Sequence, residues 1–376
     1  MKLSRFSRAG MAVVAGALAL SLAACGSDDP LAGDNGAAGN GDADTGNGSA
    51  LSGEFSGAGA STQERSMQAW IASFQDQHPG VSVNYDPSGS GAGRTQFLAG
   101  GILWAGTDLV LTEDEVAQSV EVCGPEGSID LPVYISAIAV AFNLEGIDSL
   151  NLSSDNIAKL FTGEITRWND PAIVADNPGV DLPDLAVTPV HRSDSSGTTN
   201  NFIDWLHATA PEAFPHPASS TWPLEGGESA AGTSGVVNAV TNTPGAVTYS
   251  DLGAIGALGR ASIQVGDTWQ APSAEGAALA VEVSPLIEGR HEHDMAVQLD
   301  RTTTEAGAYP LVLVSYAVVC LHYENEMDGQ FIKAFMTYIT SDSAQATSAQ
   351  VADSAPITAT LRDQIADSLA AITFGS

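Results

Sequence analysis

Basic side chains are scarce in this sequence. Its 376 residues contain 13 lysines and arginines against 45 aspartates and glutamates, so the formal charge is −32 at pH 7. Nucleic acids attract proteins through basic surfaces, and anionic membranes attract polybasic segments. The composition therefore argues against a nucleic-acid partner and against a polybasic membrane contact.

An apolar run long enough to cross a membrane is lacking near the N-terminus. The stretch Met11–Leu22 is too short for a spanning helix. It follows three basic residues and leads into LAAC at 22–25, a pattern typical of a secretory signal. A cysteine directly after Leu-Ala-Ala resembles a bacterial lipobox, which implies a lipoprotein signal peptide at 1–24 and acylation (palmitate) of the Cys25 sulfur. The alternative is a buried N-terminal helix with a chance cysteine.

The next segment, 25–52, has almost no apolar side chains and consists mainly of Gly, Ala, Asp, Asn and Ser. This composition predicts a flexible linker behind the lipidated Cys25. We therefore expect an exported protein that is anchored by lipid to the outer face of the cytoplasmic membrane.

Cysteine is rare, with three residues in the chain. Besides Cys25 there are Cys123 and Cys320, and an even pair in an exported protein predicts one disulfide. Two separate buried thiols are the alternative. The spacing fits no zinc motif, and His291 and His293 form a lone pair on a polar stretch typical of a surface loop. We expect no metal and no cofactor.

From Gly53 onward the sequence alternates strand and helix patterns, which predicts an α/β fold. Two long apolar strands at 131–142 and 309–320 suit a sheet that is covered on both faces. We interpret them as the crossings between two lobes.

The predicted lobe I comprises 53–135 and 318–376, and the predicted lobe II comprises 136–317. This division places Cys123 and Cys320 in the same lobe, near the hinge.

Three Gly/Ser/Thr-rich stretches, Ser56–Thr62, Ser88–Gly93 and Asp194–Thr199, are each predicted to follow a strand and open a helix. The first amides of a helix lack intrahelical acceptors and carry partial positive charge, which favours anions. One such stretch is typical of a plain turn or cap. Three in one chain, beside Arg192, predict an oxyanion site.

Arg192 would offer a bidentate fork to an oxyanion, and Asp194 is expected to orient its guanidinium. The alternative is an ordinary surface ion pair between the two. The candidate serines lack the Gly-x-Ser-x-Gly pattern of a hydrolase, so we expect a binding protein and no enzyme.

Six motifs resemble those of the substrate-binding protein of the phosphate-specific (Pst) ABC importer. They are GAGAST, SGSGAG, AGTD, TGEITRWNDP, HRSDSSGTTNNF and TPGAVTYSD, in this order from about Gly53 onward. The resemblance implies a two-lobed periplasmic-binding-protein fold, type II-like, with the ligand cleft between the lobes. It further implies a monomeric receptor that binds inorganic phosphate and delivers it to the permease subunits, without catalysis.

The resemblance also assigns the phosphate-binding positions, with Asp194 as the partner of the arginine. The sequence departs from the family's more usual Thr-Phe at 61–62, so donation from Thr62 is expected from its backbone only. Arg94 receives no role. The binding positions are Ser61, Thr62, Ser90, Asp108, Arg192, Ser196, Gly197 and Thr198.

Asp108 is unusual because a carboxylate in an anion site repels its ligand unless the ligand carries a proton. Phosphate keeps one proton at neutral pH and sulfate does not, so Asp108 is expected to select phosphate. The alternative reading of Asp108 is a helix N-cap. The nearer alternative function is a receptor for a sulfate-like oxyanion. An alternative from another class is a secreted serine phosphohydrolase.

The acidic composition generates a first prediction. The surface charge opposes the approach of an anion, and salt screens that repulsion. We therefore expect the association rate of phosphate, measured by stopped flow, to rise with ionic strength. A rate that falls as salt is added contradicts this expectation.

Overall fold

A computed structural model describes residues 51–375 of the chain. The predicted signal peptide, Cys25 and nearly all of the predicted linker lie outside these residues. No helix within 51–375 is both long and apolar enough to cross a membrane.

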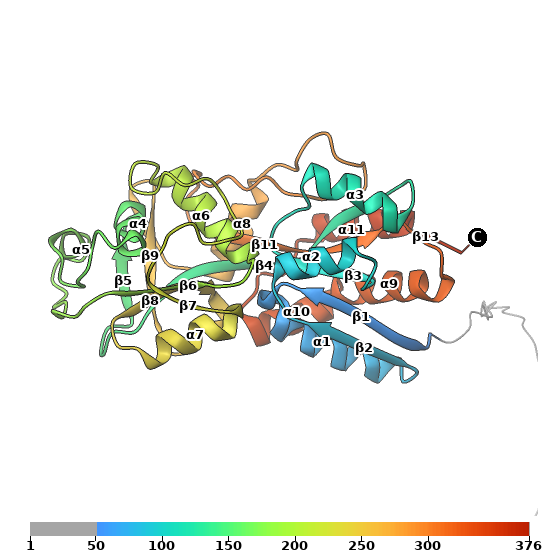
Figure 1. Cartoon of the computed structure of the whole chain (residues 1–376), viewed down its shortest axis with the longest axis horizontal. Helices are drawn as coiled ribbons and strands as arrows, with labels where there is room; N and C mark the ends of the chain where they lie inside the picture. The colour runs from blue at the N-terminus through green and yellow to red at the C-terminus, as the bar shows by residue number, and fades with distance from the viewer. Residues whose placement is uncertain (1–50, 376) are drawn as a thin grey trace, which may run out of the picture. The chain divides into compact units, whose positions relative to one another are not determined.

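The strands form a mixed sheet whose main path runs in the order β2-β1-β3-β11-β4-β8-β6-β7 (Figure 1). The strands β5, β9 and β10 join this sheet beside β4, and β12 pairs with β13 separately. The strand bounds are β1 Gly53–Gly59, β2 Val81–Asp86, β3 Trp104–Thr107, β4 Ser128–Phe142, β5 Ser149–Leu152, β6 Thr188–Arg192, β7 Glu228–Ala230, β8 Ala246–Asp251, β9 Gly259–Val265, β10 Thr268–Gln270, β11 Val312–Cys320, β12 His322–Tyr323 and β13 Thr373–Phe374.

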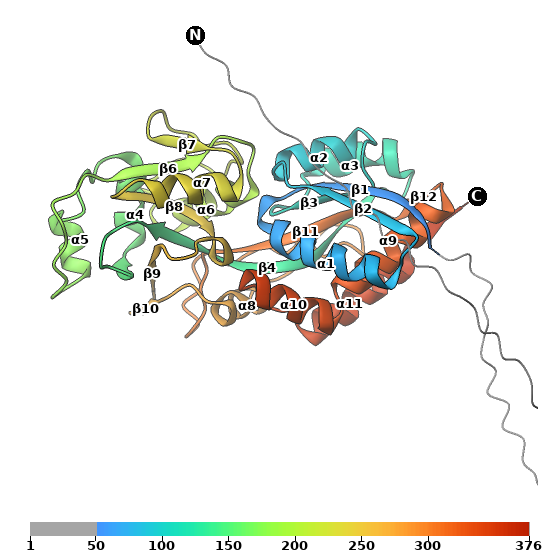
Figure 2. The same ribbon diagram turned by 90° about the horizontal axis from the view of Figure 1, so that it is seen from below.

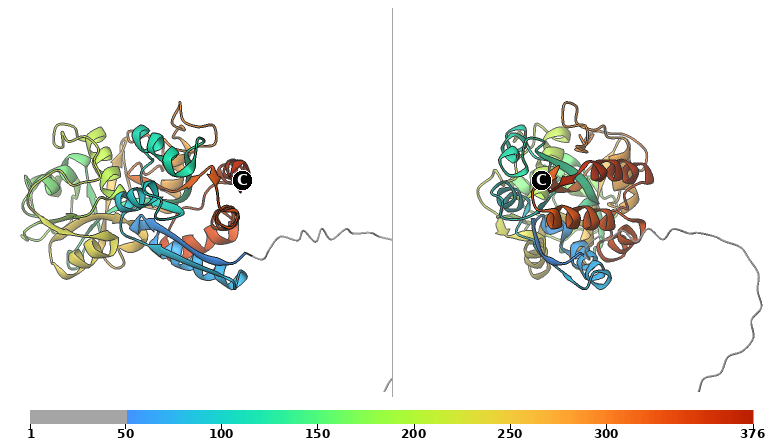
Figure 3. Two further views of the ribbon diagram at one scale, coloured as in Figure 1. Left: turned by 45° about the vertical axis from the view of Figure 1, so that its right-hand side comes forward. Right: turned by 90° about the vertical axis from the view of Figure 1, so that its right-hand side faces the viewer.

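Helices alternate with the strands, which confirms the predicted α/β class. In α1 the apolar side chains of Met67, Trp70 and Phe74 are buried, and His78 caps the end of the helix. The bounds are η1 Ser61–Gln63, α1 Glu64–Gln77, α2 Ser90–Leu98, α3 Glu113–Cys123, α4 Ser154–Thr162, α5 Pro171–Asp176, α6 Gly197–Thr209, α7 Gly232–Asn242, η2 Leu252–Ala254, α8 Ala274–Glu282, α9 Glu326–Ile339, α10 Asp342–Ala352 and α11 Ala359–Ala371. The C-terminal helices α9 to α11, orange to red, lie in the same half of the molecule as the N-terminal strands β1 and β2, blue (Figure 3).

The long strands β4 and β11 connect the two halves of the sheet (Figure 2). Every residue of β4 is buried, as expected for an unbroken apolar strand with both faces covered. Its first part, up to Ala137, pairs with β11, whereas Ile138–Phe142 pairs with β8. A two-lobed fold built on these crossings agrees with the expectation, and the predicted lobe boundaries fall inside β4 and β11.

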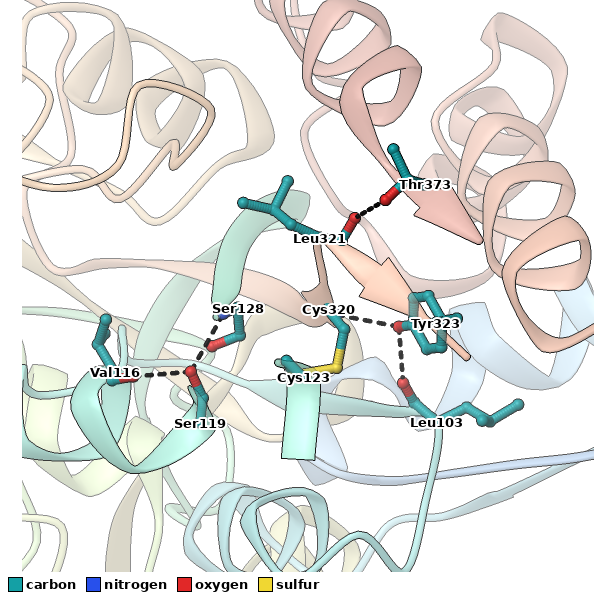
Figure 4. Close-up of a disulfide and its surroundings, with 9 residues drawn as sticks. All are labelled: Leu103, Val116, Ser119, Cys123, Ser128, Cys320, Leu321, Tyr323 and Thr373. Carbon is teal, nitrogen blue, oxygen red and sulfur yellow. Dashed lines mark hydrogen bonds between the residues drawn. A yellow bond between two sulfur atoms is a disulfide. The ribbon is translucent and has the colours of Figure 1, made fainter. Parts of the chain in front are cut away.

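The structure joins Cys123 and Cys320 in a disulfide, with their Cα atoms 5.0 Å apart (Figure 4). Cys123 ends α3 and Cys320 ends β11, opposite Ser128 at the start of β4. The expected position near the hinge stays a prediction. The disulfide lies at one end of the β4–β11 ladder, and β4 changes its partner from β11 to β8 at Ile138, at the other end of that ladder.

The disulfide closes a loop with a sequence separation of 197 residues. In the chain-entropy description, opening so long a loop lowers the free energy of unfolding by about 5 kcal/mol. We expect this loss in the double variant Cys123→Ser/Cys320→Ser, measured by urea unfolding. Alkylation and mass spectrometry of the oxidised wild-type protein provide the control, and two free thiols there overturn the prediction.

Candidate oxyanion site

The candidate site forms where β1, β2, β3 and β6 end. The strands β1, β2 and β3 are mutually parallel neighbours, so their carboxyl ends meet at one edge of the sheet. In open α/β sheets this edge is where ligands bind. The second and third Gly/Ser/Thr-rich stretches and Asp108 follow these strand ends, whereas the first stretch begins inside β1, which extends to Gly59. Each stretch opens a helix, as predicted.

The first stretch runs from the end of β1 into η1. The Ser61 hydroxyl lies 2.9 Å from Oγ1 of Thr233 at the start of α7 and accepts a hydrogen bond from the Thr233 amide at 3.1 Å. The Thr62 hydroxyl donates to Oδ1 of Asp108 at 2.6 Å. The one hydroxyl proton of Thr62 is thus engaged by Asp108, and donation to a ligand from the Thr62 backbone stays a prediction.

The second stretch opens α2, whose first residue is Ser90. Its hydroxyl accepts a hydrogen bond from the Asp108 amide at 3.1 Å. Gly89 has φ +99°, and a Cβ there would lie 2.5 Å from Oδ2 of Asp194. Glycine is thus required at 89 for its conformation and for the close approach of the third stretch.

The third stretch begins with the ion pair of Arg192 and Asp194. Arg192 is buried, and its Nε and Nη2 donate to the two carboxylate oxygens of Asp194 at 2.7 and 2.5 Å. Burial raises the pKa of Asp194, but the hydrogen bonds and charge of Arg192 outweigh it and hold that pKa below its usual range. The alternative of an ordinary surface pair is wrong for Arg192, whose side chain is 2% exposed.

Contacts of Tyr249 with backbone and side chains hold the third stretch in place. The Tyr249 hydroxyl accepts from the Arg192 amide at 3.3 Å and lies 2.8 Å from the Thr199 hydroxyl. The Tyr249 ring stacks on Phe202 of α6, with the ring centroids 4.3 Å apart. These contacts join the end of β6 to the start of α6.

Helix α6 begins with Ser196 as its N-cap, and the Ser196 hydroxyl accepts from the Thr199 amide at 3.2 Å. The amides of Gly197 and Thr198 belong to the first turn, so they have no intrahelical acceptor. A Cβ on Gly197 would lie 2.6 Å from Cβ of Asp108. The absence of a side chain at 197 therefore lets the helix start touch the end of β3.

Asp108 lies at the centre of these contacts and is 3% exposed. Its Oδ1 accepts from Thr62 and from Ser315, both at 2.6 Å, and its Oδ2 accepts from Thr198 at 3.1 Å. Burial raises the pKa of Asp108 above its usual range, and the hydrogen bonds from Ser315, Thr62 and Thr198, with the charge of Arg192, reduce this rise without cancelling it. The N-cap alternative for Asp108 is wrong, because Thr112 caps α3 in a capping box with Glu115.

Sequence reasoning missed Ser315, Gln63 and Asn201. Asn201 donates to the Asp108 carbonyl oxygen at 2.6 Å, and Gln63 donates to the Ser315 hydroxyl at 2.7 Å. The only signal for Ser315 was its position as the single polar side chain of the apolar stretch that forms the first part of β11, VLVSYAVV.

Arg94, to which the sequence assigned no role, is buried in the structure. Its Nε donates to Glu115 at 2.9 Å and its Nη1 donates to the Thr107 hydroxyl at 3.3 Å. Arg94 thereby joins α2 to α3 and to the end of β3, directly before Asp108. Its contacts give it a structural role beneath the site.

A cleft of about 720 Å³ adjoins Asp108, and Arg192 is not among the residues that line it. Asp108, Asn201 and Asp204 are part of its wall, whereas none of the other predicted binding residues lines it. Within residues 51–375 no group of three or more His, Cys, Asp and Glu side chains could hold a metal ion. The site itself presents hydrogen-bond donors around the carboxylate of Asp108, and a second carboxylate, that of Asp194, is paired with Arg192.

Comparison with known proteins places the chain in a family. Residues 42–343 match the PBP superfamily domain. The phosphate-binding protein PstS 3 of Mycobacterium tuberculosis is 35% identical over 347 residues, which cover 89% of this chain and 90% of that protein. The chain belongs to the PstS family.

A further PstS protein is similar to this chain in sequence, and a solved structure is similar in fold. PstS of Xylella fastidiosa is 31% identical over 71% of both chains. The structure of the periplasmic phosphate-binding protein PfluDING, solved with bound phosphate, superposes with a TM-score of 0.68 over 83% of this chain and 93% of that chain, at 20% identity. The two-lobed periplasmic-binding-protein fold is thereby confirmed.

The residues taken over from the PstS resemblance lie together in this structure. Thr62, Ser90, Gly197 and Thr198 contact Asp108 directly, and the charge of Arg192 acts on it. Ser61 and Ser196 are chain neighbours of residues in this group.

Proposed function

We propose that this protein is an extracytoplasmic receptor, anchored by lipid at Cys25, that binds inorganic phosphate and delivers it to an ABC-type permease. Membership of the PstS family supports the ligand and the partner. The lipobox-like LAAC at 22–25 supports the anchor and a position on the outer face of the cytoplasmic membrane.

The observation that carries the proposal is one buried carboxylate among donors. Arg192, the first-turn amides of Gly197 and Thr198, and the start of α2 offer hydrogen bonds that any tetrahedral oxyanion accepts. Asp108 offers only an acceptor, so the fitting ligand is an oxyanion that still carries a proton. Phosphate meets this condition at neutral pH.

The ligand is proposed to lie between lobe I, 53–135 with 318–376, and lobe II, 136–317, which close upon it about the crossing strands. Contacts from Thr198 to Asp108 and from Thr233 to Ser61 support this arrangement, because each joins segments of different proposed lobes. Hinge motion about two strands requires no second copy, so we propose a monomer.

A receptor without catalysis is proposed because Ser90 and Ser196, the two of the three candidate serines (with Ser234) that lie at the site, are not paired with a base. The Ser90 hydroxyl accepts from the Asp108 amide, and the Ser196 hydroxyl accepts from the Thr199 amide. Activation of a serine nucleophile needs a base that takes its proton. Neither contact supplies one.

Isothermal titration with phosphate, sulfate and arsenate tests the proposal. Phosphate and arsenate share their shape and protons, so both are expected to bind, with sulfate much weaker. Sulfate binding as tight as phosphate binding assigns the site to oxyanions in general, and no heat with any of the three anions overturns the proposed ligand.

Arg192→Ala is expected to weaken phosphate binding by about 2 kcal/mol or more, because the anion loses the guanidinium that faces it. Arg192→Lys restores only part of this loss, since one ammonium cannot both hold Asp194 bidentately and reach the ligand. Titration of both variants against the wild type measures the change, and an unchanged affinity in Arg192→Ala removes Arg192 from the site.

Asp108→Asn is expected to reduce the preference for phosphate over sulfate by roughly 10–1,000-fold, the scale of one buried polar mismatch. The variant keeps the size of the side chain and removes its charge. Its amide can turn an N–H toward the ligand, so sulfate gains most while phosphate still binds. Competition titrations give the ratio, and a wild-type ratio in the variant means that selectivity lies elsewhere.

A further inference from the structure

The Oδ1 atom of Asp108 is engaged on two sides by hydroxyl groups. Thr62 approaches it from η1 and Ser315 from β11, each with an oxygen–oxygen distance of 2.6 Å. Both distances are in the range of hydroxyl–carboxylate hydrogen bonds, which are shorter and stronger than neutral ones. The other oxygen, Oδ2, has the single longer contact at 3.1 Å from Thr198.

The proton of Ser315 points to Asp108 because another donor occupies the serine's lone pair. Nε2 of Gln63 lies 2.7 Å from the Ser315 oxygen and 3.0 Å from the carbonyl oxygen of Tyr316. A carbonyl oxygen only accepts, so the Gln63 atom that faces it is the amide nitrogen. Ser315 therefore accepts from Gln63, and its one proton goes to Oδ1 rather than to the Thr107 carbonyl oxygen at 3.4 Å.

Gln63 is held by its nitrogen end alone. Its Oε1 is buried and has no hydrogen-bond partner among residues 51–375. The two contacts of the Gln63 nitrogen fix the direction of the Ser315 proton.

We propose that Ser315 and Thr62 are specificity-determining residues of the phosphate site. Their hydroxyls saturate Oδ1 of Asp108 and hold the side chain as a carboxylate, so that Oδ2 faces the ligand as an acceptor only. Ser315 acts through Asp108 as a positioning residue, with Gln63 behind it. This inference rests on the proposed function and concerns the pH range over which the site rejects sulfate.

The protonation state of Asp108 depends on two opposing effects, its burial and the hydrogen bonds that it accepts. Burial raises the pKa of Asp108, and the hydrogen bond from Ser315 heads the contributions that lower it, followed by Thr62 and Thr198. If Asp108 becomes protonated, it donates a hydrogen bond and no longer distinguishes an oxyanion that carries a proton from one that does not. Loss of the two hydroxyls therefore moves this change to higher pH.

Other charged or titratable groups also face Asp108 from the elements around it. The charge of Arg192 acts on Asp108, and Asp251 at the end of β8 has its pKa raised to about 7 by burial, with a contribution from Asp108. Tyr85 of β2 and Tyr134 of β4 have pKa values raised by burial and by Asp108 among other charges. On the α6 side Asp204 shares the wall of the adjoining cleft with Arg301. All of these groups are present in both proteins of a wild-type–variant pair, so the difference between the two profiles isolates the hydroxyls.

The test compares wild-type protein with Ser315→Ala, Thr62→Val and the double variant. Phosphate affinity and sulfate competition are measured from pH 5 to pH 8. In the wild type the preference for phosphate is expected to fall only at the acidic end of this range. In the double variant the fall is expected at a pH higher by about one unit or more, with smaller shifts in the single variants.

Two controls separate positioning from general destabilisation. Ser66→Ala removes another buried hydroxyl, one that bonds to Ser348 and not to Asp108, and is expected to keep the wild-type pH profile. Ser315→Thr keeps a hydroxyl and is expected to restore most of it. A double variant whose pH profile overlays that of the wild type overturns the inference.

Two further outcomes are decisive. Failure of the wild type to bind phosphate contradicts the proposed function itself. A wild type that binds phosphate selectively, together with a double variant that has the same pH profile, contradicts only the further inference. If the variants do not fold, the carboxyl carbon of Asp108 in wild-type protein is titrated by NMR. A carboxyl protonated at pH 7 overturns the inference, and an ionised one supports it.

Discussion

The site depends on one constraint, the need to keep a carboxylate charged after removing it from water. A buried carboxylate without partners takes up a proton, so its charge persists only where donors surround it. Asp108 is buried at the end of β3 and receives hydroxyl donors at both oxygens. The order of the strands, the glycine at 197 and the polar side chain within β11 all serve this arrangement.

The donors of Asp108 come from distant parts of the chain, which ties the chemistry to the architecture. Thr62 follows β1, Ser315 lies on the crossing strand β11, and Thr198 belongs to the first turn of α6. A register irregularity in the β4–β11 ladder falls between Ser315 and Tyr316. Bulges of this kind re-aim side chains next to functional sites. The crossing strand thus connects the two halves of the sheet and also completes the site.

The part of the site that sequence reasoning could predict is the local part. Arg192 and Asp194 are two residues apart, and Ser196 caps the helix that it precedes, so each interaction is encoded within one short stretch. The contact of Ser315 with Asp108 joins residues 207 apart, and that of Gln63 with Ser315 joins residues 252 apart. No local pattern specifies such pairs, because they depend on the order of the strands. The fold class was predictable because it depends on local sequence. The strands at 131–142 and 309–320 consist almost entirely of apolar residues, and this alone predicts that both of their faces are buried.

The scarcity of basic residues acquires a meaning once their positions are known. The side chains of Arg192, Arg301 and Arg94 are 2%, 6% and 9% exposed, and each pairs with a carboxylate. Arg290, at 13% exposed, bonds to both Asp130 and Asp294, and burial together with the charge of Asp294 raises the pKa of Asp130 to about 7. Arg192, Arg301 and Arg94 are buried and Arg290 is partly buried, while acidic side chains dominate the surface. A buried guanidinium is screened little by salt, unlike a charge on the surface. The proposed anion site therefore retains its attraction for the ligand within a protein whose outer charge repels it.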